Sequence, residues 1–248
     1  MRVASLFGLL ILALPAPAAA QGAAAPPPPP PRQEGTAEVA FVGTSGNSST
    51  NTFSISGEHI ARPAPWLVKN RVAFIRNKAE DVKTAESFLY GLRTERSISP
   101  RLAAFGEYVY FHDAFAGVDH RNGVTGGLMF KLVDTAAHHL SVDAGLGYLN
   151  EQRLAGDDVS SATYGFGSNY KWTISPTATL EDDSRLIGTF ANADDWRFVN
   201  LVSLTARLTQ LLSLKVSNAI RYAHFPPPGF KTTDTTTSIA LVAKFARQ

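Results

Sequence analysis

Residues 212–222 read LSLKVSNAIRY, and their polarity alternates along the chain. One face would carry Leu212, Leu214, Val216, Ile220 and Tyr222, and the other Ser213, Lys215, Ser217, Ala219 and Arg221. Successive side chains of a β-strand point to opposite faces, so this period of two predicts a strand with one apolar and one polar face. We find no helical period of comparable strength elsewhere in the chain.

The same alternation recurs about twelve times, and Gly, Pro, Asn, Asp or Ser residues close the runs. The other runs span residues 37–43, 51–58, 68–74, 84–97, 101–112, 122–131, 138–150, 160–172, 177–189, 196–209 and 236–246. The run 177–189 is the weakest, because Asp182 falls on its apolar face. We predict an all-β fold, a transmembrane antiparallel up-and-down β-barrel of about 12 strands.

The segments between these runs alternate in length. Tight turns are expected at residues 62–65, 99–100, 134–137, 175–176 and 209–212, and mostly longer polar loops at 77–83, 113–121, 151–159, 191–195 and 224–234. Outer-membrane barrels have short turns on the periplasmic rim and longer loops on the extracellular rim. An even number of strands would place both ends of the barrel on the short-turn rim.

The N-terminal residues predict export. Arg2 supplies a positive charge, residues 3–14 are an apolar run, and Ala18 to Ala20 precede the predicted cut, so residues 1–20 match a cleavable signal peptide. Residues 21–34 are rich in Ala and Pro and include six consecutive prolines, which predicts an extended periplasmic spacer. The barrel domain would then be residues 35–248, in the outer membrane of a Gram-negative bacterium.

Composition narrows the functional classes. The formal net charge of +2 gives no basic footprint for nucleic acid. The chain has no cysteine, which excludes disulfides, thiolate nucleophiles and Cys-ligated metals. No apolar stretch after the signal is long enough for a transmembrane helix. A mean hydropathy of −0.04 is typical of barrel strands, which show lipid only every second side chain.

Two arrangements share this alternation, because the apolar faces could meet lipid or fill the core of a soluble β-protein. About twelve long strands would enclose a void that inward apolar side chains could not fill. Aromatic residues near strand ends also match the girdles of membrane barrels: Trp66, Tyr110, Tyr148, Trp172, Trp196, Tyr222 and Phe245. We therefore expect lipid outside and a polar lumen.

The polar faces supply the candidates for the lumen, which are Lys69, Arg71, Arg207, Lys215, Arg221 and Lys244. Arg207, Lys215 and Lys244 fall toward the short-turn rim. The adjoining walls carry the acidic residues Glu38, Glu181 and Asp183. Unpaired positive charge at this constriction would favour anions, whereas complete pairing would make a salt-bridged plug.

Several segments together are similar to one known family. They are Gly46-Asn47-Ser48, Tyr108, Asp113 with the run from Phe115 to Arg121, Gly145-Leu146-Gly147-Tyr148, and Lys171-Trp172. The chain resembles the YdiY-like family of salt-induced outer-membrane proteins, which carries a domain of unknown function. The resemblance spans nearly the whole mature chain. It implies an outer-membrane barrel and no established catalytic residues.

The C-terminus departs from barrels that end on an aromatic residue, because Ala246, Arg247 and Gln248 follow Phe245. We predict that Phe245 is the assembly signal and that the last three residues are an extension. Expected partners are outer-membrane lipids and, during insertion, the barrel-assembly machinery. Nucleic acid is not an expected partner, and the oligomeric state stays open.

The strongest candidate for chemistry is the loop with His112, Asp113, Asp119, His120 and Arg121, because histidine beside carboxylate can act as a base or bind a metal. These histidines lack a defined ligand spacing, and no nucleophile lies beside them. We instead expect Asp119 and Arg121 to form a turn and an ion pair that closes the loop. We predict no catalytic residue, metal or cofactor.

Two functional hypotheses remain. The first is a non-catalytic, porin-like membrane protein, either a small-solute channel or a structural protein of the envelope in osmotic stress. The alternative is an outer-membrane lipid-modifying hydrolase, which would need a lipid-facing serine near a histidine. The sequence shows no such pairing on an outer strand face. Ion conductance would support the first hypothesis, and lipid hydrolysis the second.

Overall fold

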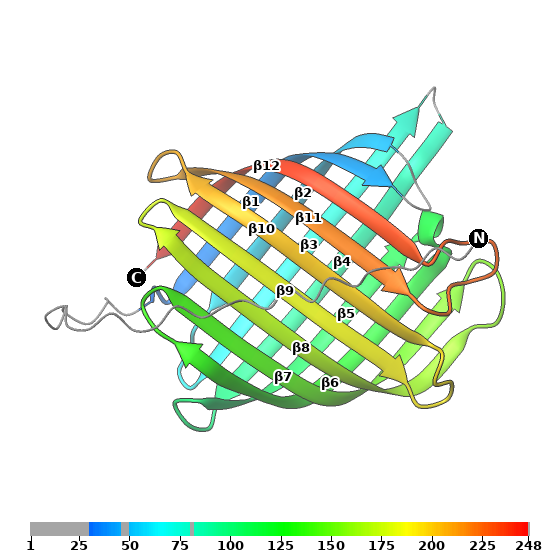
Figure 1. Ribbon diagram of the computed structural model, residues 1–248, viewed down its shortest axis with the longest axis horizontal. Helices are drawn as coiled ribbons and strands as arrows, with labels where there is room; N and C mark the ends of the chain where they lie inside the picture. The colour runs from blue at the N-terminus through cyan, green and yellow to red at the C-terminus, as the bar shows by residue number, and fades with distance from the viewer. Residues whose placement is uncertain (1–29, 46–49, 80–81, 248) are drawn as a thin grey trace, which may run out of the picture.

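The computed structural model describes residues 30–45, 50–79 and 82–247. Within them every strand pairs antiparallel with its sequence neighbours, and the first strand also pairs with the last, which closes a barrel (Figure 1). The strands are β1 (Gln33–Ser45), β2 (Thr50–Ala61), β3 (Trp66–Ala79), β4 (Val82–Ser97), β5 (Leu102–Asp113), β6 (Val118–Asp134), β7 (His138–Arg153), β8 (Val159–Ser175), β9 (Ala178–Thr189), β10 (Trp196–Arg207), β11 (Leu212–Ala223) and β12 (Thr233–Arg247). The predicted up-and-down barrel of about 12 strands is confirmed.

Both ends of the barrel lie at the predicted rim, but the two rims differ less in connector length than the sequence predicts. Gln33 pairs with Arg247, so both ends of the described barrel lie at one rim. Short turns at residues 62–65, 98–101, 135–137, 176–177 and 208–211 lie at this rim, which we call the short-turn rim. The opposite loop rim carries residues 114–117, 154–158, 190–195 and 224–232. The predicted signal peptide and residues 21–29 of the predicted spacer lie outside the described residues, as do Gly46 to Ser48 of the family motif.

Several strands extend beyond the ends that the alternation predicts. The expected longer loop at residues 77–83 is wrong, because β3 continues to Ala79 and β4 begins at Val82. At the loop rim, β6 begins at Val118 and β7 continues to Arg153. Backbone pairing does not require an apolar outer face, so a ladder can continue past the point where polarity stops alternating.

The last strand is also longer than expected. Ala246 pairs with Glu34 and Arg247 pairs with Gln33, so these two residues belong to β12 and the predicted C-terminal extension is wrong for them. Gln248 lies outside the described residues. Phe245 is paired with Gly35, and its side chain is exposed on the outer surface.

The faces of the wall separate by polarity. Directly paired residues of antiparallel strands share a face, so the register fixes the inward and outward sets. The outward set carries exposed apolar side chains, among them Ile55, Val72, Phe74, Val124, Leu128, Leu146, Phe166, Leu204, Leu214, Val216, Ile239 and Leu241. Among the described residues the buried apolar clusters are small, such as Ala103, Phe105 and Met129. The apolar faces therefore lie outside. No helix among the described residues has the length and apolarity to cross a membrane.

Glycines allow close approach between β6 and β7. A Cβ atom at Gly127 would lie 2.1 Å from the carbonyl oxygen of Ala144, and one at Gly147 would lie 2.2 Å from that of Val124. No side chain fits at these separations. At these inward positions β6 and β7 place no side chain in the lumen, which leaves room for the charged residues of neighbouring strands.

Candidate functional site

Charged side chains cross the middle of the lumen. We call Arg93, Glu95, Glu107, Asp143 and Arg185 the mid-lumen cluster. Arg93 lies 2.7 Å from Glu95, 3.6 Å from Glu107 and 3.1 Å from Asp143. Arg185 lies 3.3 Å from Glu107 and 3.4 Å from Asp143. Because β5 and β9 are four strands apart around the closed wall, the pair of Glu107 and Arg185 spans the lumen.

Alternation along each strand puts these charged groups on the inner face, and the register brings them together. Arg93 is paired with Glu107, and Asp143 faces Gly167, which itself pairs with Arg185. Gly167 has no side chain, and a Cβ atom there would lie 2.6 Å from the Asp143 carboxylate. This glycine therefore gives Asp143 the room to meet both guanidinium groups.

A cavity of about 350 Å³ leads from the short-turn rim to the mid-lumen cluster. Its outer part is lined by Arg62, Lys131 and Asp134, and its inner part by members of the mid-lumen cluster. Lys69 and Arg71 also line it. The lumen is thus open as a charged vestibule on one side of the cluster.

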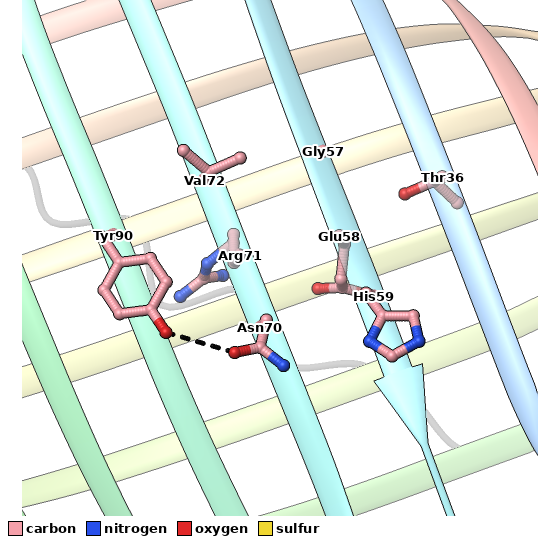
Figure 2. A pocket seen from close by; sticks show the side chains of 8 residues that line it. All are labelled: Thr36, Gly57, Glu58, His59, Asn70, Arg71, Val72 and Tyr90. Atoms are coloured by element: carbon pink, nitrogen blue, oxygen red, sulfur yellow. Dashed lines mark hydrogen bonds between the residues drawn. The ribbon is translucent and has the colours of Figure 1, made fainter.

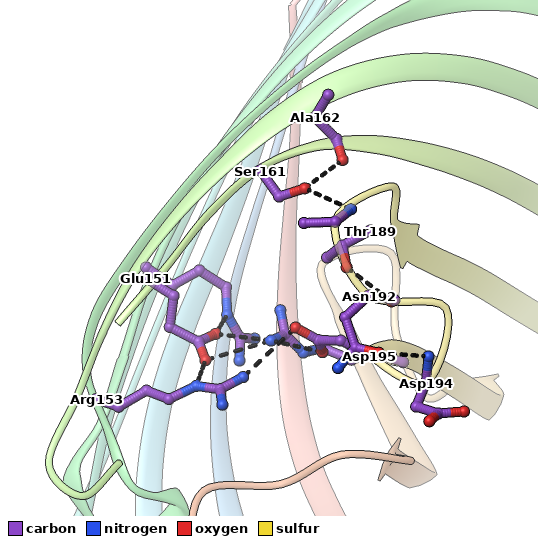
Figure 3. Close-up of polar contacts among 11 residues, drawn as sticks. Glu151, Arg153, Ser161, Ala162, Thr189, Asn192, Asp194 and Asp195 are labelled. Carbon is purple, nitrogen blue, oxygen red and sulfur yellow. Dashed lines mark hydrogen bonds and ion pairs between the residues drawn. The ribbon is translucent and has the colours of Figure 1, made fainter. Parts of the chain in front are cut away.

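A second charged group lies near the loop rim, and we call Arg121, Glu151, Arg153, Asp195 and Arg197 the loop-rim cluster (Figure 3). Glu151 is 1% exposed and accepts from Arg121 at 2.5 Å, Arg153 at 2.6 Å and Arg197 at 3.2 Å. Asp195, 3% exposed, lies 3.5 Å from Arg153 and 3.2 Å from Arg197. Buried charges need such compensation, so this cluster is a packed element rather than a wet surface.

Loops pack across the same end of the barrel. The ring of Phe230, from the loop between β11 and β12, lies 2.7 Å from where a Cβ atom of Gly117 would be, and Gly117 has φ +77°. Pro228 of the same loop lies similarly close to Gly156. Asp113 accepts from the backbone of Phe115 and Ala116, which fixes the short helix η1 (Ala114–Ala116). The loops that follow β5, β7 and β11 therefore contact one another at the loop rim.

The structure places the predicted lumen residues on the inner face, but their pairing differs. Lys215 lies 2.9 Å from Glu38, and Lys244 lies 3.7 Å from Glu34. Arg221 is directly opposite Asp234. Among the described residues, Lys69, Arg71 and Arg207 form no ion pair within 4 Å, and Arg71 is directly opposite Glu58. The predicted basic patch at the short-turn rim is thus largely neutralised, and Lys69, Arg71 and Arg207 are the predicted lumen residues without an ion pair.

The loop motif differs from expectation in one respect. Arg121 pairs with Glu151 and not with Asp119, so the expected loop-closing ion pair is wrong. A register shift between Val118 and His120 separates Asp119 from the inward face on which Arg121 lies. Asp119 instead contacts His120 at 3.2 Å, and its carbonyl oxygen contacts His112.

Sequence reasoning missed the loop-rim cluster, because it assigned Glu151, Arg153 and Asp195 to polar loops. Glu151 and Arg153 continue the inward parity of Leu149, and that spacing of two was the available signal. The barrel closure then brings Arg197 from β10 to the same carboxylate.

The structure also bears on the other chemical candidates. In the described part of the chain, no group of three or more His, Asp or Glu side chains is placed to hold a metal. His138 bonds Tyr170 at 2.8 Å and stacks on Trp172, as in an aromatic girdle. No serine in this part is hydrogen-bonded to a histidine, so nothing supports the hydrolase alternative.

A smaller hollow of about 310 Å³ lies in the wall beside Gly57 (Figure 2). Its lining comes from both faces: Arg71 is on the inward face, whereas Asn70 and Tyr90 face outward. The hydroxyl of Tyr90 donates to Asn70 at 3.2 Å, as Figure 2 shows. The hollow joins neither charged cluster, so the lumen is the candidate site.

Comparisons with known proteins agree with this architecture. The family model described as "Protein of unknown function, DUF481" matches residues 37–245. No curated protein matches the chain significantly. The structure is similar to the NanC porin, with a TM-score of 0.59 and 11% identity, over 84% of this chain and 100% of that one.

Two further solved structures are similar. The translocator domain of the autotransporter NalP from Neisseria meningitidis has a TM-score of 0.49 and 11% identity, over 86% of this chain and 88% of that one. A KdgM porin in complex with disordered oligogalacturonate has a TM-score of 0.47 and 8% identity, over 84% and 99%. At 11% identity, the likeness to NanC shows the fold alone, that of an outer-membrane barrel. Since the family model covers nearly the whole described barrel, the chain belongs to the DUF481 family of proteins of unknown function.

Proposed function

We propose that this protein is a non-catalytic outer-membrane channel for small ions and solutes, held at low conductance by the mid-lumen cluster. The observation that supports the proposal most is the pair of Glu107 and Arg185, which joins two strands that are four positions apart around the wall. The vestibule of about 350 Å³ ends at this point. Permeation would then depend on these side chains.

The cluster is suited to a barrier that ions can pass. Arg93, Glu107 and Asp143 are each about one tenth exposed and line the vestibule. Arg93 and Arg185 each have more than one carboxylate within 4 Å, so a side chain that releases one partner keeps another. Rings of charged side chains set selectivity in other pores. Small ions could thus pass by exchanging partners, whereas larger solutes would be excluded.

The remaining charge supports a preference for anions. Lys69 and Arg71 line the vestibule, and no ion pair neutralises them in the described part of the chain. Arg207 contributes a further positive charge near the short-turn rim. Because Lys215 and Lys244 are near carboxylates, we expect the preference to be weak. We also propose export through the signal sequence and residence in the outer membrane of a Gram-negative bacterium, where an osmotic role would be served by such a channel.

Conductance of the purified protein in planar bilayers tests the proposal. The variant Arg93→Ala/Arg185→Ala removes both cations of the mid-lumen cluster and should raise single-channel conductance about several-fold, because it widens the constriction. Lys171→Ala is the matched control, since Lys171 pairs with Glu181 on the inner wall outside this cluster. If folded wild type and variant are both silent, the barrel is a closed structural protein.

A further inference from the structure

A band of polar side chains lies on the outer surface, where lipid is expected. Its members are Ser168 of β8, Asp182 and Ser184 of β9, Asn200 of β10 and Asn218 of β11, and we call them the outer polar belt. Asp182 is directly opposite Val202, which is opposite Asn218, and Ser184 is opposite both Ser168 and Asn200. Asp182 alternates with the inward residues Glu181 and Asp183, so its outward direction follows from the register.

The belt lies at one depth in the wall. Ser168, Ser184, Asn200 and Asn218 are each six or seven residues from the short-turn end of their strands, and Asp182 is four. Apolar side chains of the same outer face flank the belt along its strands: Leu180 and Leu186 on β9, Phe198 and Leu204 on β10, and Val216 and Ile220 on β11. The belt is therefore within the apolar band and not at its edge.

Hydrogen bonds within the belt use only part of the donors and acceptors of its side chains. Asn200 donates to Asp182 at 3.1 Å and to Ser184 at 2.9 Å, and Ser184 donates to Asp182 at 3.2 Å. Asn218 donates to Thr237 of β12 at 2.9 Å. A carboxylate has about four acceptor sites, so two of those on Asp182 remain for another donor.

This arrangement is unfavourable against lipid. Polar and ionisable groups in the hydrocarbon region are costly and normally face protein or water. The wall at β6 and β7 shows the usual alternative, with Val124, Leu128 and Leu146 exposed at corresponding outward positions. The polar character is thus a property of the β8 to β11 wall, which needs a partner that can form hydrogen bonds.

We propose that a second copy of this chain packs on the β8 to β11 wall within the membrane, with the two outer polar belts face to face. Copies inserted in the same orientation are related by an axis along the membrane normal, which brings belts of equal depth together. The belt is self-complementary, because it offers free acceptor sites on the Asp182 carboxylate and the second amide hydrogen of Asn218, which donates only once within its own chain. Ala178 and Ala206, paired on the same face, permit close approach of the two walls.

Cysteine cross-linking tests the proposal, because the chain has no cysteine of its own. Val202→Cys introduces a thiol between Asp182 and Asn218, and Leu146→Cys introduces one at mid-strand on β7, outside the β8 to β11 wall and three strands from β10. Oxidation in isolated outer membranes should give a band of twice the monomer mass for Val202→Cys and little or none for Leu146→Cys. Heat-modifiable migration on unboiled gels reports whether each variant is folded.

Further substitutions test whether the polar side chains of the belt hold the two copies together. In the Val202→Cys background, Asp182→Leu with Asn200→Leu should reduce the dimer band about tenfold. This is the change expected when one or two hydrogen bonds between membrane-embedded segments are lost. Asp182→Asn, which keeps hydrogen bonding, should retain the band. The proposal is overturned if folded Val202→Cys stays monomeric, if Leu146→Cys cross-links equally, if the leucine variant keeps the full band, or if the cross-linked product contains a different protein.

Discussion

Glu151→Ala should destabilise the barrel markedly, because it removes the carboxylate on which three guanidinium groups converge. Glu151 is 1% exposed, and breaking a buried charge pair by removing one partner costs about 3–5 kcal/mol. Arg153 and Arg197 would keep their ion pairs with the carboxylate of Asp195, at 3.5 and 3.2 Å. Arg121 would lose its ion pair to Glu151. We therefore expect the lower end of the range, about 3 kcal/mol in the free energy of unfolding.

Urea-induced unfolding of the protein in lipid vesicles, followed by tryptophan fluorescence, measures this free energy by linear extrapolation. Lys171→Ala is the control, because Lys171 and Glu181 are 44% and 46% exposed and such a pair contributes about 0–1 kcal/mol. Glu151→Gln should fall between the two, since it keeps hydrogen-bond acceptance without charge. A loss of less than about 1 kcal/mol for Glu151→Ala would refute the view that the loop-rim cluster is a buried, mutually compensated unit.

Three further predictions address packing, assembly and conduction. Gly127→Ala should destabilise by about 1–3 kcal/mol through overpacking against the Ala144 carbonyl, whereas Gly123→Ala, with its nearest atom at 3.7 Å, should be tolerated in the same unfolding assay. Phe245→Ala should lower the amount of heat-modifiable protein in outer-membrane fractions more than deletion of residues 246–248 does; the opposite order would place the assembly signal beyond Phe245. In reversal-potential measurements under a salt gradient, Lys69→Ala/Arg71→Ala should weaken anion preference more than Lys215→Ala, because Glu38 already neutralises Lys215; equal effects would contradict the pairing.

The lumen residues show how far sequence reasoning extends. Lys215 and Arg221 were assigned to the polar face by parity alone, and the register places them inside. The neutralisation of Lys215 by Glu38 could be anticipated only in outline, because it depends on β1 lying beside β12 and on the reach of a lysine across β12. The predicted pairing of Asp119 with Arg121 is wrong because of a register shift between β6 and β7, which the local sequence pattern does not predict.

The alternation of polarity by itself determined the strands, their two faces and the approximate size of the barrel, because side-chain direction in a strand is a local property of the backbone. It also marked Asp182 as a carboxylate on an apolar face. Only the tertiary structure decided which charges meet. Arg185 reaches Glu107 because the wall curves around the lumen between β5 and β9, and Glu151 meets Arg197 because it curves in the same way between β7 and β10. It likewise aligned Asn200 and Asn218 with Ser184 at one depth, since relative depth depends on strand tilt and register, and these are fixed only when the barrel closes.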